Sequence, residues 1–132
     1  MVELHKINPQ TWQDSFAYSQ AIEVKEAHHV LYGAGQTSVD SEGKPQHGND
    51  MRAQMRLALE NVERILDAAG YSLADVVRLK VYTCDMDATL KNYEVFVQRF
   101  QVVGCQPALT MIGVARLAFP EFLVEIEATA AK

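Results

Sequence analysis

An amphipathic helix is the feature that most constrains the fold of this chain. Between residues 51 and 69, apolar side chains recur at spacings of three and four, which is the period of one helix face. The stripe consists of Met51, Met55, Ala58, Leu59, Val62, Leu66 and Ala69. Asn49 or Asp50 can cap its start, and Gly70 stands where a left-handed C-cap is expected. Such a helix must cover a sheet or another helix with its apolar face.

Two further segments alternate in the way that half-buried strands do. In residues 76–84 the apolar face would consist of Val77, Leu79, Val81 and Thr83. In residues 122–129 it would consist of Phe122, Val124, Ile126 and Ala128. Successive side chains of a strand point to opposite faces, so the other face would carry Arg78, Lys80, Tyr82, Leu123, Glu125, Glu127 and Thr129. Both segments fit a sheet with one covered side.

The remaining segments complete the order of elements. Residues 19–24 and 29–35 suit two short strands, and their closeness predicts a hairpin. Residues 38–50 concentrate Gly, Pro, Ser, Asp and Asn and are expected to form a loop. A second helix should begin within residues 85–88, and a further strand should cover residues 109–117. One side of this second helix would carry Leu90, Tyr93, Val97 and Phe100, with Phe96 adjacent.

These elements predict an α+β domain of order β-β-α-β-α-β-β over residues 1–132. Its mixed sheet would carry two helices packed on one face. A single core in a chain of 132 residues can bury about two-thirds of the surface that the unfolded chain exposes. Several apolar residues would point to the uncovered face of the sheet, so we expect a homo-oligomer.

Composition narrows the classes of function. The net charge of −5 and the pI near 5.3 argue against a nucleic-acid partner, which needs clustered Lys and Arg. Cys84 and Cys105 lie far apart and form no CxxC pair, a pattern that suits reduced thiols in the cytoplasm. The start MVELHKINPQ has no apolar core typical of a signal peptide, and no apolar run is long enough to cross a membrane. We therefore expect a cytoplasmic protein.

Two sequence features could suggest a cofactor or a metal ion, but the details of each argue against such a site. Gly33-Ala34-Gly35 begins like a dinucleotide loop, but Ser38 stands where the third glycine belongs and no helix starts there. Small residues at this point indicate a strand end that backbone or ligand approaches closely. The four histidines have no metal-ligand spacing with cysteines or carboxylates. We expect no cofactor and no metal.

Glu125 and Glu127 leave two interpretations open. On an alternating strand they share one face, where like charges repel unless one of them has a partner or faces a cleft. They could be two ordinary carboxylates on a solvated face. One of them could instead act on a water or a polar ligand in a cleft between subunits.

Several blocks together resemble the reactive intermediate deaminase family, also called RidA/YjgF. They are AYSQAIEV, YGAGQTSVDSEGKP, the helix with AQMRLALEN, PALTMIGVARL and VEIEATA, in collinear order over about residues 18–130. The resemblance implies a chorismate-mutase-like fold and a homotrimer with a small-molecule cleft between each pair of subunits. It also implies hydrolysis of imines and enamines to a keto acid and ammonia, without a cofactor of the protein's own.

Carried over position by position, the resemblance implies a site that is only partly kept. Glu125 matches a glutamate that orients the attacking water. Leu109 stands where an arginine usually grips the substrate carboxylate. The ligand-facing positions implied in this way are Tyr18, Ala34, Gly35, Tyr93, Leu109 and Met111. Ala34 replaces a frequent serine, Tyr93 a frequent asparagine and Met111 a frequent cysteine or other small residue. The chain thus resembles branches that lack the arginine, for which general imine deaminase activity is not expected.

Two classes of function follow. The chain could be a hydrolytic imine or enamine deaminase with an altered, less acidic substrate range, in which Glu125 handles the water. It could also be a non-catalytic trimer that binds a small metabolite or a protein partner. An endoribonuclease, suggested by older names in the family, is disfavoured by the acidic balance and by the absence of an RNA-reading motif.

Overall fold

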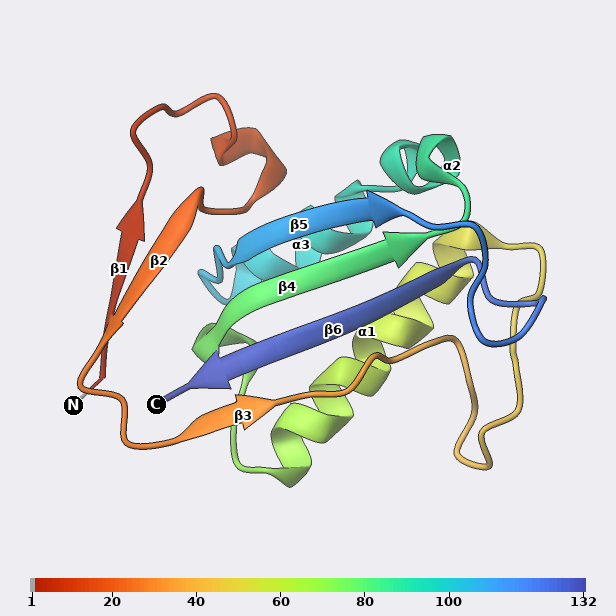
Figure 1. The fold of residues 1–132 in the computed structure, drawn as a ribbon, viewed down its shortest axis with the longest axis horizontal. Helices are drawn as coiled ribbons and strands as arrows, with labels where there is room; N and C mark the ends of the chain where they lie inside the picture. Colours follow the sequence, from red (N-terminus) through yellow and green to blue (C-terminus); the bar gives the residue numbers. More distant parts are fainter. Residues whose placement is uncertain (1) are drawn as a thin grey trace.

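The computed structural model describes residues 2–132, which form six strands and three α-helices (Figure 1). In chain order the elements are β1 (Glu3–Ile7), β2 (Ala21–Lys25), β3 (Val30–Tyr32), α1 (Met51–Ala68), β4 (Val76–Thr83), α2 (Met86–Lys91), α3 (Glu94–Val102), β5 (Ala108–Gly113) and β6 (Val124–Ala131). Strands β1 and β2 form a separate antiparallel ribbon, and the other four form a mixed sheet of order β3-β6-β4-β5. Only β4 and β5 run parallel within that sheet.

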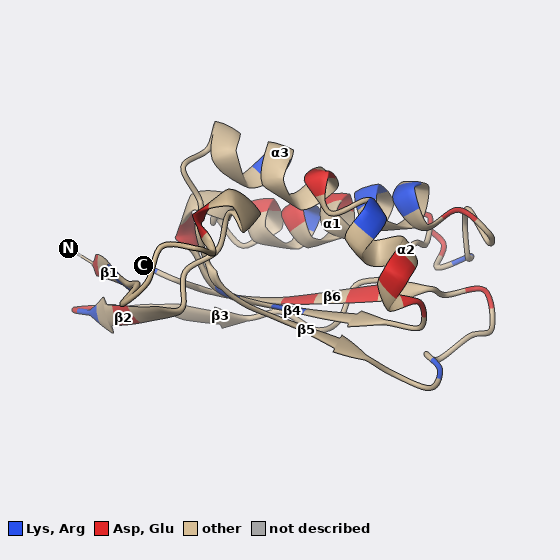
Figure 2. Cartoon of the chain, turned by 90° about the horizontal axis from the view of Figure 1, so that it is seen from above, with Lys and Arg blue, Asp and Glu red and all other residues tan. Residues whose placement is uncertain are grey.

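All three helices lie on one face of the four-stranded sheet (Figure 2). The α+β class and the single helix-covered face are therefore confirmed. The opposite face, called the open face below, carries no helix from residues 2–132. Tyr32 of β3 and Ile112 of β5 belong to it by strand register, and their side chains are largely exposed. Among the described residues, no helix is long and apolar enough to span a membrane.

The core confirms the main periodic patterns. Asp50 caps α1 by accepting a hydrogen bond from the Ala53 N–H at 3.0 Å, and Gly70 adopts the left-handed conformation with φ of 80°. The buried side of α1 includes every stripe residue except Ala69, which is exposed. On β6 the predicted inner face is buried as well. On β4 the register shifts between Val76 and Arg78, so that Val76 takes the innermost place predicted for Val77.

The predicted hairpin between residues 19–24 and 29–35 is wrong. Strand β2 pairs with β1, with Ile7 opposite Ala21, whereas β3 pairs with the C-terminal strand β6. The chain turns at Glu26, whose φ is positive at 56°. The N–H groups of His28 and His29 then donate to the Lys132 carbonyl, which directs the following strand to the edge of the sheet. The first strand, β1, was not predicted.

Two other boundaries differ from expectation. The second predicted helix is interrupted at Asn92, whose side-chain amide donates to the Ala88 carbonyl at 2.9 Å, and it continues as α3. The break exposes Leu90, which was predicted to lie in the apolar stripe, while Phe96 and Phe100 are fully buried. Strand β5 ends at Gly113, so the last four residues of the predicted strand over 109–117 lie outside it.

Two polar side chains of α1 fix the loops beside the sheet. Gln54 is fully buried, and its amide donates to the carbonyls of His47 at 2.9 Å and Glu121 at 2.8 Å. Its carbonyl accepts from the Leu123 N–H at 2.9 Å. About two helical turns further along α1, the Asn61 side-chain amide donates to two carbonyls of the loop that follows β3. The Gln54 contacts thereby position the start of β6, and the Asn61 contacts hold the loop after β3.

Candidate functional site

An apolar pocket of about 230 Å³ lies beside the edge strand β5. Its lining residues are Trp12, Phe16, Tyr18, Leu90, Tyr93, Leu109 and Met111. In the parallel ladder, Leu109 pairs with Leu79 and Met111 with Val81, and paired residues share a face of the sheet. Because Leu79 and Val81 belong to the buried core, Leu109 and Met111 lie on the helix-covered side.

The pocket is held together by a seam between two segments far apart in the sequence. The Ser19 N–H donates to the Pro107 carbonyl at 2.9 Å, and the buried Ser19 hydroxyl donates to the Gln106 carbonyl at 2.6 Å. Ser19 thereby forms a parallel bridge with Ala108. The YSQA and QPAL segments are therefore neighbours in space, which places Tyr18 beside the strand that carries Leu109.

Tyr93 both packs in the core and lines the pocket. Its hydroxyl donates to the Phe16 carbonyl at 2.8 Å, and its ring meets those of Phe16 and Phe96 edge to face. Burial raises the pKa of the Tyr93 phenol well above its usual range, so the group stays protonated. Because its proton already forms a hydrogen bond with the Phe16 carbonyl, this hydroxyl does not offer a donor to a ligand.

Glu125 lies on the open face, on the central strand β6. It stands opposite Tyr82 in the antiparallel ladder, and Gly35 approaches it from the far side. A Cβ at position 35 would lie 2.8 Å from the Glu125 Cδ and 2.9 Å from its Cγ, closer than real contacts allow. Only glycine allows this placement, because the Glu125 carboxylate passes directly over the backbone that follows β3. The small residues at 33–35 predicted a strand end that another group approaches closely, and here the group is this carboxylate.

Gly35→Ala is expected to displace the Glu125 side chain while leaving the fold intact. The φ of Gly35 is not positive, so alanine fits the backbone, and a carboxylate on a flexible side chain can rotate away. We expect a change of no more than about 1 kcal/mol in the free energy of unfolding, together with loss of any activity that depends on Glu125. Urea denaturation and an activity assay check the two parts. A fully active variant would show that this placement of the carboxylate is unimportant.

Glu127, the second carboxylate of the strand, has a partner. The Tyr82 hydroxyl donates to the Glu127 Oε1 at 3.3 Å. Partial burial, followed by the charge and hydrogen bond of Glu127, raises the pKa of Tyr82. Lys80 lies opposite Glu127 in the ladder. No side-chain hydrogen bond or ion pair joins the Glu125 carboxylate to another of the described residues, so the two carboxylates occupy different environments on the same face.

The predicted site residues fall into two groups that do not meet in one chain. Tyr18, Tyr93, Leu109 and Met111 line the apolar pocket on the helix-covered side. Gly35 and Glu125 meet on the open face. Ala34, the remaining position, is exposed and lines a small hollow beside α1.

Sequence patterns missed three pocket residues, namely Trp12, Phe16 and Leu90. Trp12 and Phe16 belong to the connection between β1 and β2, where no periodic pattern marks a buried or ligand-facing side. The only available signal was the presence of two large aromatic residues in a segment otherwise rich in polar residues. Leu90 was assigned to the core instead.

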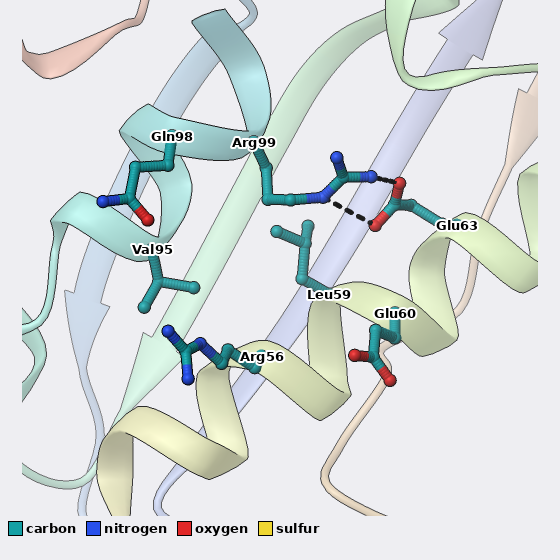
Figure 3. A pocket seen from close by; sticks show the side chains of 7 residues that line it. All are labelled: Arg56, Leu59, Glu60, Glu63, Val95, Gln98 and Arg99. Carbon is teal, nitrogen blue, oxygen red and sulfur yellow. Dashed lines mark hydrogen bonds and ion pairs between the residues drawn. The ribbon is translucent and has the colours of Figure 1, made fainter. Parts of the chain in front are cut away.

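Another hollow, of about 270 Å³, lies between α1 and α3 (Figure 3). Leu59 and Val95 form its apolar part, and charged side chains surround them. Arg99 and Glu63 form an ion pair across it. This hollow contains none of the predicted site residues. Within residues 2–132, no three His, Cys, Asp or Glu side chains converge in the manner of a metal site.

Comparison with known proteins agrees with the blocks identified in the sequence. The profile of a family described as endoribonuclease L-PSP matches residues 10–132. A RutC family protein of Pyrococcus horikoshii is 41% identical over 115 residues, covering 87% of this chain and 86% of the relative. TdcF of Escherichia coli, named as a presumed reactive intermediate deaminase, is 36% identical over 92 residues, covering 67% of this chain and 70% of TdcF.

Solved structures agree with the fold. A Rid family protein of unknown function from Yersinia pestis, YyfB, has a TM-score of 0.85 at 35% identity, covering 98% of each chain. The structure of Escherichia coli TdcF with bound serine has a TM-score of 0.71 at 31% identity, covering 87% of each chain. The match over nearly the whole sequence, together with the shared fold, leads to one conclusion: this chain belongs to the endoribonuclease L-PSP family, which is the RidA/YjgF family.

Proposed function

We propose that the chain is a cofactor-independent hydrolase of an imine or enamine, with its active cleft built by two copies of the chain. The observation that carries this proposal is the separation of the two residue groups. Leu109 lies on the helix-covered side of the sheet at one edge, whereas Glu125 lies on the open face of its central strand. If both belong to one site, as the family resemblance implies, the site needs a second copy.

The exposed apolar surface supports an assembly. Tyr32 and Ile112 on the open face are 80% and 43% exposed, and Trp12 and Phe16 at the pocket are 60% and 44% exposed. Tyr32 and Ile112 lie on the two edge strands of the open face, and Trp12 and Phe16 line the pocket, so exposed apolar side chains occur on both of the surfaces that an assembly would bring together. A homotrimer, as in the family resemblance, would place the open face of one copy against the pocket edge of the next.

The proposed chemistry uses Glu125 as the base. Its carboxylate accepts a proton from a water, whose oxygen adds to the carbon of the C=N bond as the π electron pair moves to nitrogen. The nitrogen takes that proton from Glu125, which gives a carbinolamine. Glu125 then takes the hydroxyl proton and returns it to the nitrogen as the C–N bond breaks, which leaves a carbonyl compound and ammonia. An enamine first takes a proton at carbon and loses one from nitrogen to become the imine. The structure of TdcF with bound serine shows that this relative can hold a small amino acid, which supports a small-molecule ligand for this chain.

Subunit complementation tests the shared cleft. Glu125→Gln removes the base, and Leu109→Glu places a charge in the apolar pocket, so each variant alone is expected to release almost no ammonia. Co-expressed, they should regain about a quarter of the wild-type rate, because random assembly leaves that share of clefts with both intact halves. Ammonia release from freshly generated enamine analogues without a carboxylate is the readout, with 2-aminoacrylate as the acidic comparison and solution mass measured alongside. A monomeric mass, or no recovery in mixed assemblies of normal mass, would contradict the proposal.

A non-catalytic binding protein is the second candidate, and the side chain of Leu109 favours it. The pocket offers no guanidinium to grip a carboxylate. If wild type is inert with every imine tested and Leu109→Arg gains activity, the scaffold is intact and the native cleft only binds its ligand. Turnover by wild type that Glu125→Gln abolishes would support the hydrolase instead.

A further inference from the structure

We propose that the apolar pocket selects a neutral carbonyl or imine compound with a branched or aromatic apolar group, and that it discriminates against carboxylates. The inference deepens the proposed function, on which it rests in taking this pocket as the substrate end of the cleft. Binding to the pocket can be measured without turnover, so the two proposals can fail separately.

The lining chemistry is the first ground. None of the seven lining residues carries a charge, and Leu109 and Met111 form the wall along the sheet. A carboxylate that enters such a pocket loses its hydration without gaining a charge-assisted partner. An aliphatic or aromatic group gains from leaving water instead.

The hydroxyl groups near the pocket are the second ground. The Tyr93 hydroxyl donates to the Phe16 carbonyl, and the Ser19 hydroxyl donates to the Gln106 carbonyl. Of the two phenols that line the pocket, only that of Tyr18 has no hydrogen-bond partner among residues 2–132. One donor matches a single carbonyl or imine group, but it cannot replace the several donors that a carboxylate requires.

The shape of the pocket is the third ground. Trp12 meets Tyr18 edge to face at a ring-centroid distance of 6.4 Å, and Phe16 meets Tyr93 in the same way at 5.7 Å. Within each pair the rings hold each other in place, and all four residues line the hollow. The volume of about 230 Å³ leaves room for a small branched or aromatic group.

Trp12 provides the measurement, because it is the only tryptophan in the chain and it lines the pocket. Its fluorescence can be titrated with 4-methyl-2-pentanone and with 4-methyl-2-oxopentanoate, which differ in carrying a methyl group or a carboxylate on the carbonyl carbon. We expect a saturable change with the ketone at a concentration at least about tenfold lower than with the keto acid. Leu109→Arg should reverse this preference. Val102→Ala changes a side chain on α3 that is 79% exposed, and it should leave the preference for the ketone unchanged.

Two results would overturn the inference. One is equal or tighter binding of the keto acid by the wild-type protein, and the other is the absence of any saturable signal with the ketone. Selective binding of the ketone without ammonia release in any imine assay would contradict only the proposed hydrolase. Turnover of acidic imines together with tight keto-acid binding would contradict only the selectivity.

Discussion

Gln54→Leu is expected to lower the free energy of unfolding by about 3–5 kcal/mol. Leucine fills a similar volume but cannot hydrogen bond, so the Glu121 carbonyl and the Leu123 N–H lose their partner. The His47 carbonyl keeps only its hydrogen bond from the Asp50 N–H. Each buried polar group that loses its partner costs about 1–3 kcal/mol. Because these groups belong to two different loops, neither loop can satisfy the other once the amide is gone.

Urea denaturation of the purified protein measures this loss. Gln98→Leu is the matched control, because it makes the same chemical change at an exposed position of α3 and should shift stability by no more than about 0.5 kcal/mol. A loss below about 1 kcal/mol for Gln54→Leu would mean that water replaces the amide and that the loops do not depend on it.

Glu125→Gln is expected to reduce turnover in the proposed hydrolysis by about a hundredfold to ten-thousandfold. Glutamine keeps the size of the side chain and so leaves the contact with Gly35 in place, but it cannot take a proton from water. The maximal rate of ammonia release at saturating substrate measures the effect, and thermal unfolding verifies that the fold is unchanged.

Glu127→Gln is the control for this loss, since Glu127 lies two residues away on the same face of β6. Its carboxylate accepts a hydrogen bond from Tyr82, which a glutamine carbonyl can also accept. We expect less than a threefold change, an order-of-magnitude bound for a residue outside proton transfer. Equal losses in both variants would point to the charge of the face as a whole, and not to a base at position 125.

Periodic patterns predicted the parts of the fold that one buried face determines. The stripe of α1 and the alternation of β6 appear in the structure because burial of each face is set by spacing alone. The same patterns could not reveal that Val76 enters the core, since a register shift changes the alternation locally. They also gave no reason to single out Gln54, whose neighbours in the stripe are apolar.

Pairing partners and pocket walls were harder to predict. Strand β2 could have paired with β3 on local grounds, and the outcome depends on a turn at Glu26 and on the distant Lys132 carbonyl. The family resemblance placed Tyr18 and Leu109 near one ligand, but the hydrogen bonds that join their segments are visible only in three dimensions. The same hydrogen bonds hold the segment that carries Trp12 and Phe16 beside β5, where both residues line the pocket.

The seam also determines when the pocket forms and which part of the N-terminal segment opens easily. It joins residues 87 positions apart, so the pocket can form only after the C-terminal part of the chain has folded onto the sheet. The ribbon of β1 and β2 has no fully buried residue, whereas the four-stranded sheet contains most of the core. Local opening of a segment requires little free energy where few apolar contacts hold it. The ribbon can thus open on a timescale much shorter than that of global unfolding, whereas the segment beside β5 stays attached through the seam and the buried side chains of Gln13, Ala17 and Ser19.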